Sequence, residues 1–433
     1  YIFLEGLVLR GAEEAAVNAE AAVGLVVRRC LIRDVGQGFY NADKNRPGRD
    51  FYIADNTIIG PYAWPRTGIF REEGIQLCGT GHVVCHNYIR GWSDGISILD
   101  QRGSPYSCSA IDFYNNDISE CTDDAIEMDT GEHNVRCFRN LIRDCNVGIS
   151  TQPIYGGPCY IFRNIIYNAP HTGFKTMCEP SGVLVFHNTV IRTGEVKAAF
   201  LHYDTKPVRN SVFRNNLFLG NGGRAIESWG DFIDCDFDNN GFTDGPCAFT
   251  KDGRSFKTSD LEEFKRKTGL ERHGIVVDLS IFARSIGFPV DEEKHDTVDL
   301  RLREDSAAVD RGCVLPNIND DFIGEAPDLG AYELGRPVPV YGPREEDDTV
   351  ESIPPRVEPV APDEVVAAAE PGEVAPVSEP MEIDAKTRRP PIPEQRSASE
   401  RPTIHTLVLV IGVAIVIALI AFLSTRNRLR RRC

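Results

Sequence analysis

An asparagine recurs along the first half of the chain at nearly constant spacing. In each copy it closes a short apolar strand, and an apolar pair, a polar turn and a second short strand follow it, as in residues 135–152 (VRCFRNLIRDCNVGISTQ) and 160–177 (YIFRNIIYNAPHTGFKTM). A repeat of this length holds two or three short strands and no helix, which is typical of a parallel β-helix with one repeat per coil. Three successive intervals are the same 24 residues, and the series is Asn56, Asn87, Asn116, Asn140, Asn164, Asn188 and Asn216.

Composition sets the size of the core and excludes one class of partner. The chain has 433 residues, of which 42% are hydrophobic, and a formal net charge of -17. It can therefore bury a large core, and its acidity argues against sequence-independent nucleic-acid binding. The thirteen cysteines are odd in number and irregularly spaced. Because Cys121 and Cys145 hold the same place in adjacent coils, we expect stacks of buried thiols instead of disulfides.

Two insertions rich in Gly, Pro and aromatic residues interrupt the early repeats, at residues 61–65 (PYAWP) and 100–106 (DQRGSPY). Such segments are expected to form surface loops, which either frame a binding groove or are merely tolerated. Trp64, Trp92 and Tyr106 are candidates for stacking on sugars, although aromatic residues are more often packed. Tyr106 is our candidate for substrate binding from these loops.

The second strand of each repeat contributes one polar residue at a fixed place. Because side chains alternate along a strand, the Ile or Phe of each segment should face the core and its neighbour should face outward. Two residues further on, Asp129 and Gln152 should join the same face, and Ser150 and Gln152 become candidates for substrate binding. Lys175 should lie two coils from Glu127, about 10 Å away at the usual strand spacing. The outward row is predicted to be Ser97, Glu127, Ser150, Lys175 and Glu227.

Residues 121–129 (CTDDAIEMD) place four carboxylates in seven positions. Several carboxylates on a rigid backbone suit a Ca²⁺ site, because a hard cation takes multiple oxygen ligands. We predict that Asp124, Glu127 and Asp129 form it, with Asp123 in the turn and pointing away. The alternative is a solvated acidic turn of an acidic protein.

A cation beside Lys175 would permit a definite chemistry. The cation would neutralise a uronate carboxylate and so acidify the proton on the neighbouring ring carbon, which a base can remove. Lys175 is the first candidate for this base, provided that burial or nearby cations lower its pKa, and His171 is the second. The outcome would be β-elimination or epimerisation. The alternative is that Lys175 is only a solvated charge.

The repeated Asn, the turns that follow it and the outward row resemble right-handed parallel β-helix proteins of the pectate-lyase-like superfamily, over about residues 25–240. The resemblance implies the fold firmly and the activity weakly, since the superfamily includes lyases, hydrolases, epimerases and non-catalytic surface proteins. By position, Asp124, Glu127 and Asp129 match the metal-binding corner of the lyases, and Lys175 matches their basic residue. The chain lacks the Gly-His-Gly and Arg-Ile-Lys motifs of polygalacturonases and the Asp-Pro-His motif of epimerases.

Arg139, Arg163 and His187 occupy the place just before the repeated Asn in three adjacent coils. They form a second row, on a different face. Two interpretations remain open: the row grips an anionic glycan, or its members form a solvated edge of the sheet.

The remaining chain divides by composition. The β-helix is expected over residues 1–250, beginning inside the solenoid, and a capping segment over 251–335, with a short helix from a capping Ser259 to about Thr268. A disordered Pro- and Glu-rich stalk is expected over 336–402. Residues 406–423 are eighteen residues without a charge, so a transmembrane helix is expected over 403–425, followed by a basic cytoplasmic tail over 426–433.

Together these features predict a single-pass membrane protein with an all-β, right-handed parallel β-helix on the extracytoplasmic side. We expect it to bind acidic polysaccharide and to act on it by Ca²⁺-assisted proton abstraction, which cleaves the polymer by β-elimination in a polysaccharide lyase or inverts the ring carbon in an epimerase. The alternative is a non-catalytic, glycan-binding or adhesive surface protein. The sequence does not indicate an oligomeric state.

Overall fold

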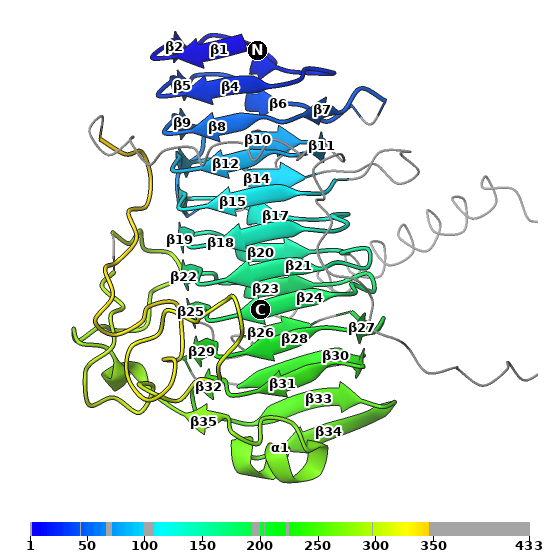
Figure 1. Ribbon diagram of the computed structural model, residues 1–433, viewed down its shortest axis with the longest axis vertical. Coiled ribbons are helices and arrows are strands. Elements are labelled where there is room, and N and C mark those ends of the chain that lie inside the picture. Colours follow the sequence, from blue (N-terminus) through cyan, green and yellow to red (C-terminus); the bar gives the residue numbers. More distant parts are fainter. Residues whose placement is uncertain are drawn as a thin grey trace, which may run out of the picture. The chain divides into compact units, whose positions relative to one another are not determined.

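The structure is a computed structural model, and it describes residues 2–43, 45–65, 72–98, 108–192, 200–202, 204–221, 225–296 and 298–345. These residues form a parallel β-helix whose coils each pass through three sheets (Figure 1). Among the described strands only β33 and β34 pair antiparallel. The predicted all-β parallel β-helix is thereby confirmed.

The three sheets, named A, B and C, follow one another within every coil. Sheet A contains β1 (Ile2–Glu5), β4 (Leu25–Arg28), β8 (Tyr52–Ala54), β12 (Val83–Cys85), β15 (Ile111–Tyr114), β18 (Val135–Phe138), β21 (Cys159–Phe162), β24 (Val183–Phe186), β28 (Val212–Arg214) and β31 (Asp236–Asp238). Sheet B contains β2 (Val8–Leu9), β5 (Leu31–Arg33), β9 (Thr57–Ile59), β13 (Tyr88–Arg90), β16 (Asp117–Ser119), β19 (Leu141–Arg143), β22 (Ile165–Tyr167), β25 (Thr189–Arg192), β29 (Leu217–Gly220), β32 (Gly241–Phe242) and β35 (Ile275–Val276).

Sheet C carries the predicted row of polar residues. It contains β3 (Ala15–Asn18), β6 (Gln37–Tyr40), β10 (Glu73–Leu77), β14 (Asp94–Ile98), β17 (Asp124–Glu127), β20 (Val147–Thr151), β23 (Thr172–Thr176), β26 (Phe200–His202), β30 (Ile226–Ile233), β33 (Cys247–Lys251) and β34 (Arg254–Thr258). The short β27 (Val208–Arg209) pairs with β30, and β7 (Gly48–Arg49) pairs with β11 (Gly79–Thr80).

The repeated Asn forms a continuous ladder at the corner between sheets A and B. Asn140 is representative: its Nδ2 donates to Asn164 Oδ1 at 2.9 Å and to the Phe113 carbonyl at 2.9 Å. The ladder begins where the Cys30 amide donates to Asn56, and it includes Asn240, which the repeat count missed. It ends on Glu271, whose carboxylate accepts from Asn240 Nδ2 at 2.7 Å. Each buried amide is therefore satisfied by the next coil.

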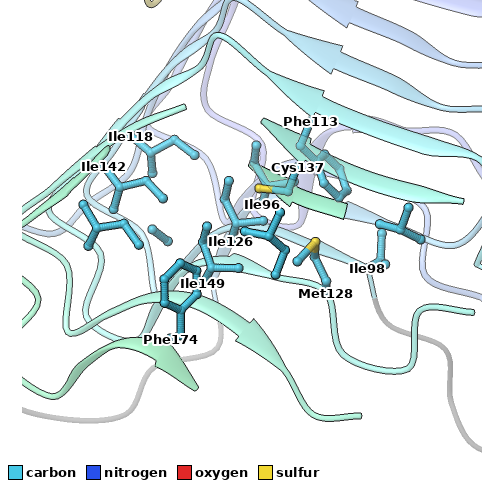
Figure 2. Packing of buried hydrophobic residues seen from close by; sticks show 14 of the residues in the cluster. Ile96, Ile98, Phe113, Ile118, Ile126, Met128, Cys137, Ile142, Ile149 and Phe174 are labelled. Carbon is cyan, nitrogen blue, oxygen red and sulfur yellow. The ribbon is translucent and has the colours of Figure 1, made fainter. Parts of the chain in front are cut away.

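The core follows the expected alternation. Ile96, Ile126, Ile149 and Phe174 are in register on adjacent strands of sheet C, and all are buried (Figure 2). The twelve cysteines among the described residues are free, and most are buried, which confirms the prediction for the cysteine stacks. These inward columns fix which residues of sheet C must face outward.

The last coil is closed by the β33–β34 hairpin and by α1 (Leu261–Thr268). This helix is the short one that the sequence predicted. The helix begins one residue later than expected, since its cap is Asp260, which accepts from the Glu263 amide at 2.8 Å. Leu261 and Phe264 are buried, and the Phe264 ring packs edge-on against Phe249 at 5.5 Å. This end of the core is therefore covered.

Residues 277–345, here called the strap, do not cover that end. They begin with the short 3-10 helix η1 (Leu279–Ile281) and run back along sheet B (Figure 1). The strap and the outward apolar residues of sheet B form a second hydrophobic cluster, which includes Leu141, Ile165, Ile191, Leu217, Phe282, Leu300 and Leu329. The later coils carry apolar residues on both faces of sheet B, and burying the outer face favours a covering segment.

The strap reaches into the region predicted to be stalk. Tyr341 is partly buried, and Arg344 pairs with Asp55 in an early coil at 2.8 Å. Residues 336–345 therefore pack on the β-helix, because their side chains find partners there. The rest of the predicted stalk, the predicted membrane segment 403–425 and the basic tail lie outside the described residues. Within the described part of the chain, no helix has the length and apolar character needed to cross a membrane.

Candidate functional site

The predicted row on sheet C exists, and its side chains face away from the core. Ser97 pairs in register with Glu127, Glu127 with Ser150, and Ser150 with Lys175. Leu201 then separates Lys175 from Glu227. The row is not an exposed wall, however: Ser150 is fully buried and Lys175 is only 8% exposed. Polar neighbours on the same face surround these side chains, so the site is enclosed.

A second acidic column lies beside this row, at the start of the same strands. Glu73 is in register with Asp94, and the Asp124 amide donates to Asp94 Oδ1 at 2.8 Å in the next coil. Neither Glu73 nor Asp94 was predicted as a site residue. The signal was present, because Asp94-Gly95-Ile96-Ser97 aligns with Asp124-Ala125-Ile126-Glu127 one coil later.

Three carboxylates of this column are close enough to share a cation. Asp94, Asp123 and Asp124 each offer one oxygen, and the three oxygens lie within 4.8 Å of one another. Asp124 is 1% exposed, and its Oδ1 has no hydrogen-bond partner among the described residues. Its Oδ2 accepts from Lys175 Nζ at 2.5 Å. A buried oxygen without a donor is the type of ligand that a cation satisfies.

This group differs from the predicted metal set, Asp124, Glu127 and Asp129, and shares only Asp124 with it. Asp123, which was expected to point away, belongs to the group. Asp129 instead accepts from Ser150 Oγ at 2.6 Å and from the Gln152 amide at 2.8 Å. Two of the three residues predicted to bind substrate, Ser150 and Gln152, therefore hold Asp129 in place.

Glu73, Asp94, Asp123, Asp124, Glu127 and Asp129 are here called the acidic cluster. Several of its carboxyl groups resist ionisation. Burial raises the pKa of Glu73 to about 7, and burial raises the pKa of Asp124 to about 7 although Lys175 opposes the shift. Burial, followed by the charges of Asp129 and Asp94, raises the pKa of Glu127. Since these groups repel one another in a dry site, the cluster retains protons or takes up a cation.

Lys175 is held in its charged form. Burial alone would lower its pKa, but the carboxylates of Asp124 and Asp129 outweigh burial and raise it. Among the described residues, Lys175 is the one cation in an ion pair with any carboxylate of the cluster. The amine can act as a base only after Asp124 has another counter-charge.

The other predicted site residues are less central. The His171 amide donates to the Asn146 carbonyl, one residue before β23, so its Cα lies about 13 Å along the strand from that of Lys175. Tyr106 lies outside the described residues. Trp92 is fully buried, and half-buried Trp64 donates its Nε1 to the Asp291 carbonyl in the strap at 2.9 Å. Neither tryptophan is displayed on sheet C.

Further toward the N-terminus, the outward face of sheet C is hollowed. A groove of about 580 Å³ is lined by acidic and polar residues of the first coils, among them Asn18, Gln37 and Tyr40. The polar surface of sheet C is therefore longer than the cluster itself.

Comparison with known proteins identifies the fold. Residues 73–242 match the family model of the right handed beta helix region, and this match contains every strand that carries the acidic cluster. No curated protein matches the sequence. The match supports the β-helix fold that the repeated Asn predicted.

Proposed function

We propose that this face of sheet C binds an acidic polysaccharide through a divalent cation and cleaves it by β-elimination, with Lys175 as the base. The observation that carries the proposal is the ion pair of Lys175 with Asp124 beside two further carboxylates, in a place where Asp124 Oδ1 is buried without a donor. Perturbed carboxyl groups around one amine are typical of functional sites.

The residues present fit a hard cation. Asp94, Asp123 and Asp124 supply oxygen ligands from two adjacent coils, and the β-helix holds their backbones rigidly. Asp94 and Asp123 are half-buried, so a bound ion there can also contact a ligand from solvent. A Ca²⁺ ion in this place would neutralise a uronate carboxylate and acidify the proton on the adjacent ring carbon.

Lys175 then has the properties of a base. When a cation offsets the charges of Asp124 and Asp123, burial opposes the charged amine against Asp129 alone among these carboxylates, so the pKa of the amine falls. The neutral amine takes the acidified proton, the electron pair of that C–H bond forms the ring double bond, and the glycosidic C–O bond breaks. The leaving oxygen takes up a proton from water. Lys175 returns its proton to solvent before the next cycle.

The second candidate is a non-catalytic glycan-binding surface protein. It is favoured by the raised pKa of Lys175, since an amine that stays protonated pairs with an anionic sugar instead of removing its proton. Anchoring through residues 403–425 is compatible with both candidates and is part of the same proposal.

The test is the ultraviolet absorbance of the unsaturated product when the full chain meets polygalacturonate, with Ca²⁺ and with chelator. We expect product with Ca²⁺ alone, and none after Lys175→Ala. Lys206→Ala is the matched control, because Lys206 is an exposed lysine in the loop after β26 and should retain activity. Binding without product under any condition would favour the second candidate, and retained activity of Lys175→Ala would remove the base from the mechanism.

A further inference from the structure

The strap does not lie flat on sheet B along its whole length. A cavity of about 770 Å³ remains there, a volume within the usual range for small-molecule sites. Leu141 of β19 and Tyr167 of β22 line it from sheet B, and parts of residues 284–287, 298–301 and 332–341 line it from the strap. The cavity shares no residue with the acidic cluster, so it is separate from the site on sheet C.

Apolar and aromatic side chains from both sides form much of the lining. They are Leu141, Tyr167, Ile286, Val298 and Val338. The Tyr167 hydroxyl donates to the Gly287 carbonyl at 3.0 Å, which ties the strap to sheet B at this point. Because burying an apolar body against such side chains removes both surfaces from water, the cavity favours a ligand with an apolar body.

A pair of tyrosines adds a hydrogen-bond donor to the lining. Tyr341 donates its hydroxyl to the Tyr332 hydroxyl at 3.2 Å, and the Tyr332 hydrogen then has no acceptor among the described residues. Burial raises the pKa of Tyr332 to about 12, and Asp299 and Arg301 lie close enough to influence it. The hydroxyl is therefore protonated at neutral pH, and a ligand oxygen in the cavity can accept its hydrogen.

The charges at the cavity are unequal. Arg301 donates to Asp299 from Nε at 2.9 Å and from Nη2 at 2.6 Å. Arg284 shares this carboxylate through Nε at 3.2 Å, and its side chain is 74% exposed. Among the described residues that line the cavity no other is charged, so the lining carries one excess positive charge in a chain of formal net charge -17. The Nη groups of Arg284 can turn to an anion while Arg301 keeps its pair.

We propose that this cavity binds a small aromatic carboxylate. The carboxylate pairs with Arg284 and accepts from the Tyr332 hydroxyl, and the ring packs on Tyr167 and Leu141. A monoanion balances the single excess charge, whereas a phosphate dianion leaves one charge unbalanced. The body is aromatic because a flat ring packs well against both a tyrosine ring and the plane of a guanidinium group. The site is independent of the proposed function, since it lies on sheet B and needs no cation.

The experiment measures the affinity of the full chain for 1-naphthoate by calorimetry. Chelator is present, so that no divalent cation can hold a carboxylate on sheet C. Two reference compounds separate the parts of the ligand: 1-naphthamide has the ring without the charge, and acetate has the charge without the ring. We expect 1-naphthoate to bind at least tenfold more tightly than either. Equal affinity for 1-naphthoate and 1-naphthamide would show that the charge is not recognised and would overturn the proposal.

A substitution in the lining places the bound anion. Arg284→Gln should weaken binding of 1-naphthoate about tenfold, which corresponds to about 1.4 kcal/mol, and leave 1-naphthamide unchanged. The fold should be retained, because Arg284 is mostly exposed and Asp299 keeps Arg301. Arg303→Gln is the matched control, an exposed arginine of the strap that pairs with Asp305 outside this cavity, and it should bind as the wild type does. Unchanged affinity of Arg284→Gln, or no binding of 1-naphthoate to the wild type, shows that the proposed site is wrong and leaves the proposed function as it stands.

Discussion

The carboxylates under the strap and those on the outward face of sheet C have opposite surroundings. Under the strap, Arg344 pairs with Asp55 at 2.8 Å and His295 pairs with Asp144 at 2.7 Å. On sheet C, carboxylates face carboxylates, and among the described residues only Lys175 pairs with any of them. Both sides belong to the same coils of one β-helix, so the coil alone does not dictate this difference.

The difference separates charges that hold the fold from charges that serve a site. Burial would raise the pKa of Asp55, but Arg344 overcomes burial and lowers it. For Asp94, burial and the neighbouring carboxylates act together and raise the pKa. A cluster that repels itself reduces stability, which favours a functional explanation for its presence.

The largest expected effect is on the strap side. Arg344→Met should lower the free energy of unfolding by about 3 kcal/mol, because the fully buried Asp55 carboxylate loses the guanidinium and retains the backbone amide of residue 344 at 3.1 Å and Arg28 at 4.0 Å. Urea denaturation measures the change. Arg303→Met, which breaks an exposed pair with Asp305, is the control and should cost less than about 0.5 kcal/mol. Equal effects of the two variants would contradict the contrast.

The next effect is a dependence of stability on pH at sheet C. Its sign is opposite to that expected for Asp55, because folding lowers the pKa of Asp55 and raises that of Glu73. The pKa of Glu73 rises from 4.5 to about 7 on folding. Between these values the unfolded chain loses a proton that the folded chain keeps, so stability falls as the pH rises through this range. The expected loss in the presence of chelator is about 3 kcal/mol. Thermal unfolding across this range should show it, Glu73→Gln should reduce it and leave the part that is due to Asp124, and a flat wild-type profile would count against the buried acids.

A smaller effect is expected from Asp94→Asn. It should raise the free energy of unfolding by about 1 kcal/mol in chelator, because it removes a like charge while the amide oxygen can still accept from the Asp124 amide. The same variant should weaken Ca²⁺ binding in calorimetry. Asp112→Asn, an acidic residue of sheet A paired with Arg136, is the control and should leave Ca²⁺ binding unchanged. A destabilised Asp94→Asn would show that the cluster is not repulsive.

The smallest effect tests the edge of the strap. Asp321→Asn breaks the pair with Arg163, in which the Arg163 side chain is 10% exposed but the Asp321 carboxylate is 49% exposed and already solvated. We expect a loss of about 0.5 kcal/mol. Chemical denaturation next to Arg344→Met gives the comparison, and a loss as large as that of Arg344→Met would show that exposure does not govern the strength of these pairs.

Parts of the site followed from the sequence because a solenoid repeats its register. The column Ser97, Glu127, Ser150 and Lys175 could be aligned from the Asn spacing alone. Asp94 was visible in the same alignment and was overlooked. The burial of Lys175 could not be predicted from the sequence, because it depends on how far side chains from neighbouring coils extend over the strand.

The row Arg139, Arg163 and His187 shows the same limit. Each residue lies at a corner with positive φ, between 51° and 55°, which the repeat places correctly at the turn. The sequence left open whether the row was solvated or gripped a glycan. In the structure Arg163 pairs with Asp321 and buried His187 contacts the Asn319 amide at 2.8 Å, so the strap covers the row.

The sequence by itself determined the coil, the ladder and the inward columns, because hydrogen bonding between identical residues and strand alternation are local rules that repeat every coil. The tertiary structure decided which outward residues stay accessible. The strap comes from more than a hundred positions away in the chain, and its path depends on which face of the finished β-helix offers apolar area and opposite charge. The strap covers the row of Arg139, Arg163 and His187 and does not cover the acidic residues of sheet C, which therefore remain as the candidate site.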